Sequence, residues 1–216
     1  MKCFRLGLMA MALATTASFA FADDTKGKCT GVCATEGSGC CITDGMAKLP
    51  KVTYLVGEES LCCEESAKAA ATAAKTKLVY VVGKEKFDAS DKAFVSLVDQ
   101  TEKFVANYAT PSTCKVSGST TVAGESMTCS VKAGEVAAKV KKAMDAVAVS
   151  YKVGEKSCQC PSEAKALAAE KKVKQVFVVD NEETECEHTA RLNLARAKYK
   201  AALLAMNTEK TDSKVQ

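Results

Sequence analysis

Two stretches of the chain, 97 residues apart, carry the same pattern of hydrophobic and polar positions. In the first stretch, Val52, Tyr54 and Val56 occupy every second position, and Gly57 follows them. A period of two built from β-branched and aromatic residues predicts a β-strand that ends at the glycine. The second stretch repeats this pattern with Val149, Tyr151, Val153 and Gly154.

Alanines at helical spacing follow each predicted strand. Ala67, Ala70, Ala71 and Ala74 recur at i, i+3, i+4 and i+7, which is one face of a helix. A further strand is predicted at 78–82 and 175–179, and a longer helix at 90–108 and 189–206. The order β-α-β-α predicts helices packed on a small sheet in each stretch. The matching helix positions in the second stretch are Ala164, Leu167 and Ala168.

The two stretches indicate an internal duplication, because 52–82 and 149–179 align without a gap and share 16 identities over 31 positions. We therefore predict an α/β (α+β) fold of two tandem β-α-β-α units packed together, rich in Ala and Val and cross-linked by cysteines. The expected segments are a signal peptide (1–22), a Cys- and Gly-rich segment (23–45), unit one (46–110), a linker with a partial third copy and a helix (111–147), unit two (148–206) and a disordered tail (207–216).

The partial third copy begins at Gly124-Glu125 and has a cysteine, Cys129, four residues before Ala133. This arrangement is similar to Gly57-Glu58 followed by Cys63 and Ala67, with one residue fewer. The apolar positions that follow predict a helix with one buried face. They are Ala133, Val136, Ala137, Val140 and Met144.

The duplicated unit resembles uncharacterised secreted bacterial proteins in which Val-x-Tyr-x-Val-Gly-[Asp/Glu] precedes a cysteine. The resemblance covers 52–82 and 149–179. It implies a tandem architecture and export, and it implies no activity.

The first residues have the layout of a secretory signal peptide. Lys2 and Arg5 precede an apolar run, which ends in Ala20-Phe21-Ala22, a small-x-small cleavage pattern. The alternative is a membrane anchor, but the run is short for a spanning helix, which needs about 20 apolar residues. We expect cleavage after Ala22 and a periplasmic or secreted protein with no membrane association after cleavage.

Composition argues against nucleic acid as a partner. Without Lys2 and Arg5 the net charge is about +2, there is no Trp, and aromatic residues make up 6% of the chain. Nucleic-acid binding requires a clustered basic face or an aromatic stacking surface. A core built from Ala, Val and Leu is small for its length and gains from cross-links.

Cysteine is the unusual residue of this composition. The chain has 12 cysteines, and 11 remain once Cys3 is removed with the signal. Outside the cytosol such a density favours disulfides, and an odd number leaves one thiol free, bound to metal or paired with another molecule. A copied disulfide would keep both ends, yet Cys62 aligns with Gln159, Cys158 with Leu61 and Cys186 with Ala89. This mismatch argues against a bridge within each unit.

Cys63, Cys160 and Cys129 are predicted to lie where a helix begins. Unpaired N–H groups and the helix dipole favour a thiolate there, and thiolates attack disulfides and bind soft metals such as Cu(I) or Zn. Vicinal or Cys-x-Cys pairs add further thiols. The candidate metal ligands are therefore Cys62, Cys63, Cys158, Cys160, Cys129, Cys40 and Cys41, for which a disulfide role is an equal alternative.

Other chemistry finds little support in the sequence. The only histidine, His188, follows Cys186-Glu187 and is interpreted as an exposed residue before the last helix, with metal binding as the alternative. There is no Cys-x-x-Cys, no Gly-x-Ser-x-Gly and no phosphate-binding glycine loop. Four acids lie beside Cys62 and Cys63, and they suit a solvated helix start but would oppose thiolate formation. They are Glu58, Glu59, Glu64 and Glu65.

We therefore expect no catalytic residues and no certain cofactor. The predicted function is that of an exported cysteine-rich binding or structural protein, stabilised by disulfides and able to bind Cu(I) or Zn through helix-start cysteines. The alternative is a periplasmic thiol–disulfide exchange protein.

Overall fold

The computed structural model describes residues 39–212 and the side chains of 42–207. All of them belong to one unit, Thr35–Gln216. The described part is mixed α+β, with six helices and three antiparallel sheets. None of its helices combines the length and the apolar character needed to cross a bilayer. The predicted signal peptide and most of the predicted Cys- and Gly-rich segment lie outside the described residues.

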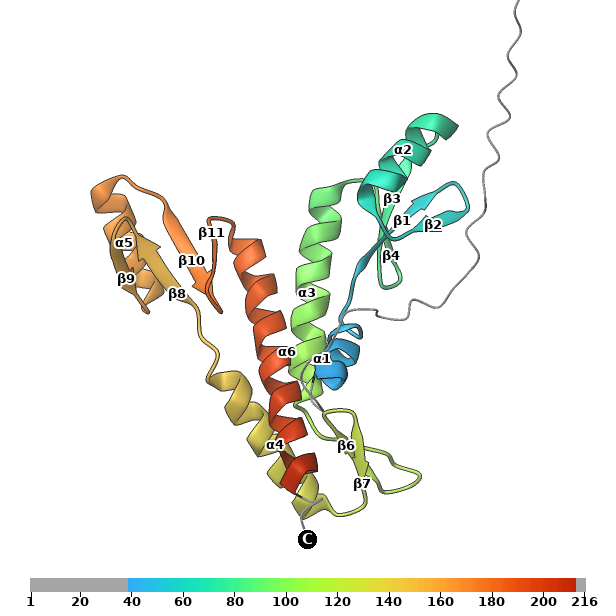
Figure 1. Ribbon diagram of the computed structural model, residues 1–216, viewed down its shortest axis with the longest axis vertical. Coiled ribbons are helices and arrows are strands. Elements are labelled where there is room, and N and C mark those ends of the chain that lie inside the picture. Colours follow the sequence, from blue (N-terminus) through green and yellow to red (C-terminus); the bar gives the residue numbers. More distant parts are fainter. Residues whose placement is uncertain (1–38, 213–216) are drawn as a thin grey trace, which may run out of the picture. The chain divides into compact units, whose positions relative to one another are not determined.

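The first sheet has the strand order β2-β1-β3-β4, and α2 and α3 both contact it (Figure 1). At its centre β1 and β3 run antiparallel, with Tyr54 opposite Tyr80, and the two rings meet edge to face with centroids 5.7 Å apart. The elements are β1 (Val52–Val56), β2 (Glu59–Leu61), α2 (Glu64–Ala74), β3 (Leu78–Val82), β4 (Glu85–Phe87) and α3 (Ser90–Tyr108).

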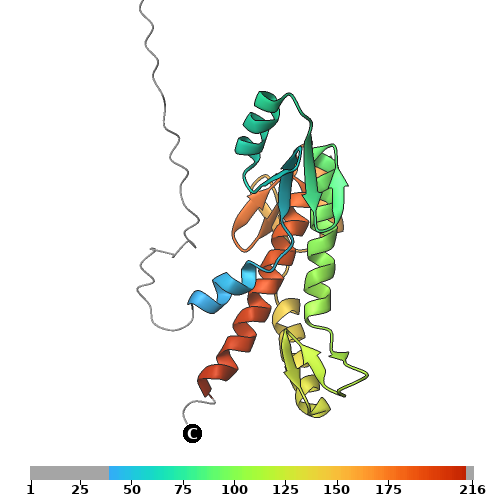
Figure 2. The ribbon, with the colours of Figure 1, turned by 90° about the vertical axis from the view of Figure 1, so that its right-hand side faces the viewer.

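A smaller sheet follows, with the order β5-β6-β7, and its central strand packs on α4 (Figure 2). The apolar face predicted for this helix is confirmed, since Ala133, Val136, Val140 and Met144 are buried. The elements are β5 (Ser112–Thr113), β6 (Thr120–Val122), β7 (Glu125–Met127) and α4 (Ser130–Asp145).

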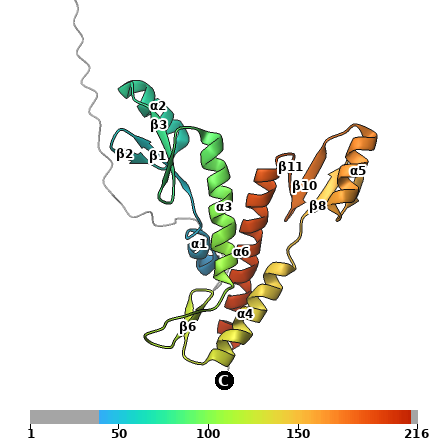
Figure 3. The ribbon, with the colours of Figure 1, turned by 180° about the vertical axis from the view of Figure 1, so that it is seen from behind.

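The second four-stranded sheet has the order β11-β10-β8-β9, which is the order of the first sheet read from the other end, and α5 and α6 contact it (Figure 3). Tyr151 lies opposite Phe177, again edge to face at 5.7 Å, as Tyr54 lies opposite Tyr80. The elements are β8 (Ser150–Val153), β9 (Lys156–Cys158), α5 (Pro161–Lys171), β10 (Gln175–Val179), β11 (Glu182–Thr184) and α6 (Glu187–Asp212).

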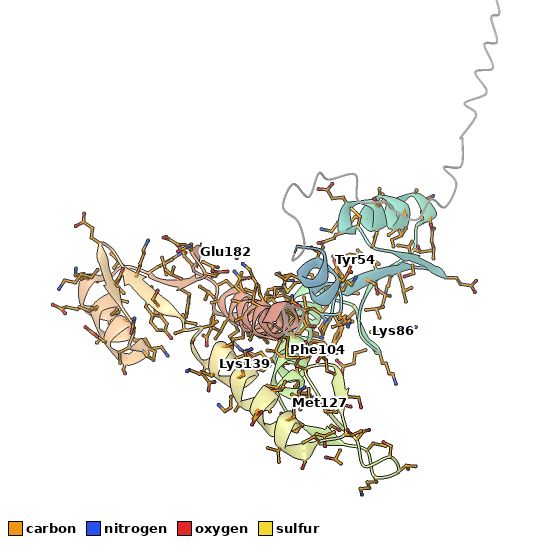
Figure 4. The ribbon with its side chains drawn as sticks, turned by 60° about the horizontal axis from the view of Figure 1, so that its bottom comes forward. Tyr54, Lys86, Phe104, Met127, Lys139 and Glu182 are labelled. Atoms are coloured by element: carbon orange, nitrogen blue, oxygen red, sulfur yellow. The ribbon has the colours of Figure 1, made fainter. Side chains whose placement is uncertain are left out.

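The largest core cluster joins α6 to α3, α4 and the short helix α1 (Gly39–Met46). Tyr199 of α6 is fully buried and packs edge to face on Phe104 of α3, which is labelled in Figure 4, and on Tyr108, at 5.3 and 4.8 Å between centroids. Its hydroxyl donates to the carbonyl of Gly45 at 3.2 Å. Arg191 of α6 adds two ion pairs to acidic residues of α3 at its exposed margin.

One local motif recurs five times in the described residues: a hairpin with a two-residue loop, followed by a helix. In each, a buried valine ends the first strand, and an alanine eleven residues later is buried in the first helical turns. The N–H of this alanine donates to the carbonyl of the residue just before the helix, which closes the first helical hydrogen bond. The valine–alanine pairs are Val56–Ala67, Val82–Ala93, Val122–Ala133, Val153–Ala164 and Val179–Ala190.

The first residue of every two-residue loop has a left-handed backbone, and three of these five residues are glycine. Gly57, Gly83 and Gly154 have φ of 63°, 59° and 63° at the first loop position, a conformation that glycine adopts without steric cost. In the last hairpin, Asp180 and Asn181 take φ of 48° and 68°, as in a type I′ turn. These loops match the right-handed twist of the flanking strands and so favour the hairpins.

The structure corrects several predicted elements. The predicted order β-α-β-α omits the short second strand of each hairpin, so the order is β-β-α-β-β-α. The Cys- and Gly-rich segment 23–45, for which no helix or strand was predicted, contains most of α1 (Gly39–Met46), and the beginning of the linker predicted from 111 contains β5 and β6. The last helix begins at Glu187 and not at Thr189, and it runs to Asp212 into the tail that we expected to be disordered.

Candidate functional site

Cysteine occupies the residue before the helix in four of the five hairpin–helix motifs. Cys63, Cys129 and Cys160 are the N-cap residues of α2, α4 and α5, with extended backbones (φ −108°, −90° and −91°). Their placement at helix starts, expected from the sequence, is confirmed. Each side chain is exposed.

Cys186 holds the same position before α6, and its carbonyl accepts from the N–H of Ala190 at 3.0 Å. Sequence reasoning missed it because the helix was expected to begin at Thr189. The spacing Val-x6-Cys-x3-Ala, read from Val179 to Ala190, would have found it.

None of the three N-cap thiols makes a conventional capping hydrogen bond. Ser, Thr, Asp and Asn are the residues that cap helices well, and replacing such a cap by Ala costs about 0.5–2 kcal/mol. Cysteine at this position therefore does little for helix stability. A role for the thiol itself is the simpler explanation of its recurrence.

Local donors favour the thiolate at two of these helix starts. The backbone N–H of Ser66, with its hydroxyl and the N–H of Glu65, lowers the pKa of Cys63. The hydroxyl of Ser162, 3.2 Å from the Cys160 sulfur, lowers the pKa of Cys160, together with backbone N–H groups of the first turn. Hydrogen bonds to the charged form are the physical cause in both cases.

A third helix start has the same chemistry. The hydroxyl of Thr189, followed by its backbone N–H and that of His188, lowers the pKa of Cys186. His188 contributes here through its main chain, and its side chain is exposed, as the sequence suggested.

The expected acidic environment is also present. The carboxylate of Glu64 is 2.7 Å from the Lys68 ammonium, so this acid is paired one turn along the helix. The charge of Glu65 raises the pKa of Cys63, which opposes the lowering by the N–H and hydroxyl donors. The effect of the donors is larger, because the pKa of Cys63 is lowered overall.

Cys158 differs from the helix-start cysteines. It ends β9 opposite Tyr151 and is half-buried. Desolvation raises the pKa of its thiol, and the charges of Glu163 and Cys160 raise it further. Cys158 and Cys160 are separated by one residue, Gln159, between the end of β9 and the start of α5.

Cys114 lies outside the hairpin–helix motifs and was not a predicted ligand. It is exposed, and a turn follows it in which the N–H of Gly118 donates to its carbonyl at 2.9 Å. The hydroxyl of Ser117, then its N–H and that of Val116, lowers the pKa of Cys114 to about 7. A short turn can therefore present donors to a thiol as a helix start does.

The seven cysteines whose side chains are described are all free, so the structure gives no support to the disulfide framework there. Nor do three or more His, Cys, Asp or Glu side chains gather into a metal-binding group within the described part of the chain. The predicted ligands Cys62, Cys63, Cys129, Cys158 and Cys160 are thus spread over three hairpins. Cys40 and Cys41 belong to α1, but their side chains lie outside the described residues.

Comparisons with known proteins assign the chain to no family. No protein-family model matches the chain, and searches of curated proteins and of solved structures returned no match.

Proposed function

We propose that the chain is an exported, non-enzymatic protein that presents thiolates from the starts of its helices and binds a soft metal ion through them. The observation that carries this proposal is the recurrence of exposed cysteine at one position of a repeated motif, in Cys63, Cys129, Cys160 and Cys186. Thiolates are the ligands that Cu(I) and Zn favour among protein side chains.

Of the two metals, Cu(I) suits the pair Cys158 and Cys160 better. Cu(I) accepts two thiolates, whereas a structural zinc takes four ligands in a tetrahedron. Two neighbouring thiols of one hairpin can supply the first arrangement without further residues. Zinc would require ligands from a second hairpin or a second chain.

We also propose that the two four-stranded sheets, each with its two helices, are the tandem units predicted from the duplication. Disulfides formed in the exported protein would then join thiols of different units or different chains. The support for this part is the density of cysteine and the compartment implied by the predicted signal peptide.

Titration of the reduced protein with Cu(I), against a chromophoric Cu(I) chelator, tests metal binding. We expect the protein to withdraw Cu(I) from the chelator, and the variant C158A/C160A to withdraw at least one equivalent less. C114S, which removes a thiol outside the motifs, is the matched control and should bind as the native protein does. Equal binding by all three proteins, or none by any, would overturn the proposal.

The redox state of the exported protein is tested by intact native mass spectrometry before and after alkylation of free thiols. A metal-free mass short of ten hydrogens, with one alkylated cysteine, would mean that the 11 cysteines form five disulfides and would exclude metal binding. A mass that includes copper, with thiols protected from alkylation until a chelator is added, would support the proposal.

Thiol–disulfide exchange is the second candidate function. A specific observation favours it: donors lower the pKa of the exposed thiols Cys63, Cys160 and Cys186. Attack on a disulfide requires a thiolate that is accessible to its substrate, and the exposure of these three cysteines and the lowered pKa of their thiols favour such attack.

A further inference from the structure

We propose that Cys158 and Cys160 form a redox-active dithiol, in which Cys160 attacks an exposed disulfide and Cys158 resolves the mixed disulfide. This inference rests on the exchange activity named above as the second candidate, and it adds a specific pair, a role for each thiol and a substrate class.

Cys158 occupies a position that holds an apolar residue in the first sheet. In the first sheet its counterpart is Leu61, which lies opposite Tyr54 and packs in the cluster around Val56 and Ala67. Cys158 lies opposite Tyr151 in the same way and is half-buried. A thiol thus occupies a position that a larger apolar side chain fills in the first sheet, at some loss of apolar burial.

This hairpin alone, among the five in the described residues, has cysteine both at the end of its second strand and before its helix. In the other hairpins the strand-end residue has no thiol. These residues are Leu61, Phe87, Met127 and Thr184.

The roles follow from the surroundings of each sulfur. Cys160 is exposed at the start of α5, and its sulfur lies 3.2 Å from the Ser162 hydroxyl. Cys158 is less exposed, lies opposite Tyr151 and belongs to β9, which α5 contacts. An incoming disulfide therefore reaches Cys160 more readily than Cys158, which suits Cys160 as the attacking thiol and Cys158 as the resolving thiol.

Bridge formation is sterically accessible. Two residues apart in an extended strand, Cα atoms lie about 6.6 Å from each other, and a disulfide accepts separations of up to about 6.8 Å. Gln159 lies in a bend, so the chain is not fully extended between the two cysteines. Cys158 is the last residue of an edge strand, so its backbone can shift without breaking the centre of the sheet. The small ring is strained, which makes the closed form easy to reduce again.

The chemistry balances over two steps. The Cys160 thiolate attacks one sulfur of the substrate disulfide, forms a mixed disulfide and releases the other sulfur as a thiolate that takes up a proton. The Cys158 thiol loses its proton, and its sulfur attacks the Cys160 sulfur, closes the Cys158–Cys160 disulfide and releases the second substrate thiol. The substrate gains two electrons and two protons, and the protein dithiol loses them.

The test follows one peptide. Trypsin cleaves after Lys156 and Lys165 and releases 157–165, which contains Cys158 and Cys160 and no other cysteine. Reduced protein is exposed to oxidised glutathione as the probe disulfide, quenched with acid at successive times, alkylated, digested and weighed. We expect the peptide to pass through a short-lived glutathione adduct and to accumulate without alkylation and short of two hydrogens.

The variant C158L is the matched comparison, because leucine is the natural residue at this place in the first sheet. In C158L the glutathione adduct of Cys160 should persist on the order of ten times longer than in the native protein, since the intramolecular attack is lost. In C160S the remaining thiol should react more slowly than Cys160 of the native protein. Circular dichroism establishes that both variants fold.

Cys186 is the control within the same digest, because 175–191 contains it as a lone cysteine. If Cys186 forms an adduct while 157–165 also ends as a stable adduct in the native protein, the dithiol is overturned and exchange at helix-start thiols stands. If neither peptide reacts, the exchange activity itself fails, and the dithiol fails with it.

Discussion

The first four-stranded sheet, with α2 and α3, and the second, with α5 and α6, share their strand order and two-residue loops but carry thiols differently. The helix starts of the first are Cys63 and Ala89, and those of the second are Cys160 and Cys186. Ala89 precedes α3 with the same extended backbone as the cysteines (φ −131°, ψ 136°). A helix start in this fold therefore does not require cysteine, whereas the buried valine and alanine recur in all five motifs.

The largest effect should come from overfilling one of these alanine positions. Ala67 and Ala164 are both fully buried at the same place in the two sheets. We expect Ala164→Leu to lower the free energy of unfolding by about 1–3 kcal/mol, because added methylenes force neighbouring side chains from their rotamers. Urea denaturation measures the loss.

Ala166→Leu is its control, because Ala166 is on the same helix and exposed. This variant should stay within about 0.5 kcal/mol of the native protein. If the two variants lost the same free energy of unfolding, burial of the alanine would have no structural role. The two sheets would then correspond only in the order of their strands and not in the packing of the following helix.

The sequence predicted the long elements of this comparison well. The strands 78–82 and 175–179 and the helix Ser90–Tyr108 have the predicted bounds, because their apolar residues keep one period over their whole length. The second strands of the hairpins escaped prediction because segments such as Glu59–Leu61 are three residues long and mostly polar. Their pairing comes from the neighbouring strand and the loop, which periodicity does not register.

The sequence predicted only some of the helix-start cysteines, because it could recognise only some of the loops that precede them. A cysteine after Gly-Glu could be placed at a helix start, as with Cys63 and Cys160, but Cys186 follows Asp180-Asn181, a loop without glycine. The proximity of Cys158 and Cys160 could be read from the sequence. Their different burial could not, since it depends on Tyr151 and on the packing of α5.

Cys114, which lies outside the motifs, and Cys158 of the second sheet should differ in their rates of alkylation. The pKa of Cys114 is lowered to about 7, whereas burial raises that of Cys158. At pH 7 we expect iodoacetamide to alkylate Cys114 about tenfold faster than Cys158, since its larger thiolate fraction outweighs the lower nucleophilicity of a more acidic thiol. The Cys114 rate should fall as the pH decreases through about 7.

Ser117→Ala sharpens this test, because the Ser117 hydroxyl is the leading cause of the lowered pKa of Cys114. The midpoint of the rate profile should move to higher pH in this variant. An unchanged profile would mean that another group sets the acidity of Cys114. Peptide mass spectrometry separates the rates of the individual cysteines.

A smaller effect, of opposite sign, is expected when a helix-start cysteine is replaced by a true cap. Cys129 is the best site because the first turn of α4 contains no acid to repel a new carboxylate. We expect Cys129→Asp to raise the free energy of unfolding by about 0.5–1 kcal/mol, through hydrogen bonds to the first N–H groups and interaction with the helix dipole. Cys129→Ala should give no gain, and a loss of stability in Cys129→Asp would mean that the thiol itself supports the fold.

The smallest change in stability should come from placing cysteine where the first sheet lacks it. Ala89→Cys puts a thiol on an extended backbone that already matches those of the cysteine helix starts, and we expect the free energy of unfolding to stay within about 0.5 kcal/mol. The new thiol should be alkylated under native conditions, so that one more exposed cysteine is counted by mass than in Ala89→Ser. If Ala89→Cys instead destabilised the protein by more than Ala89→Ser, the helix start of α3 would differ from the other four. Alanine there would then be a packing requirement and not simply a motif without its thiol.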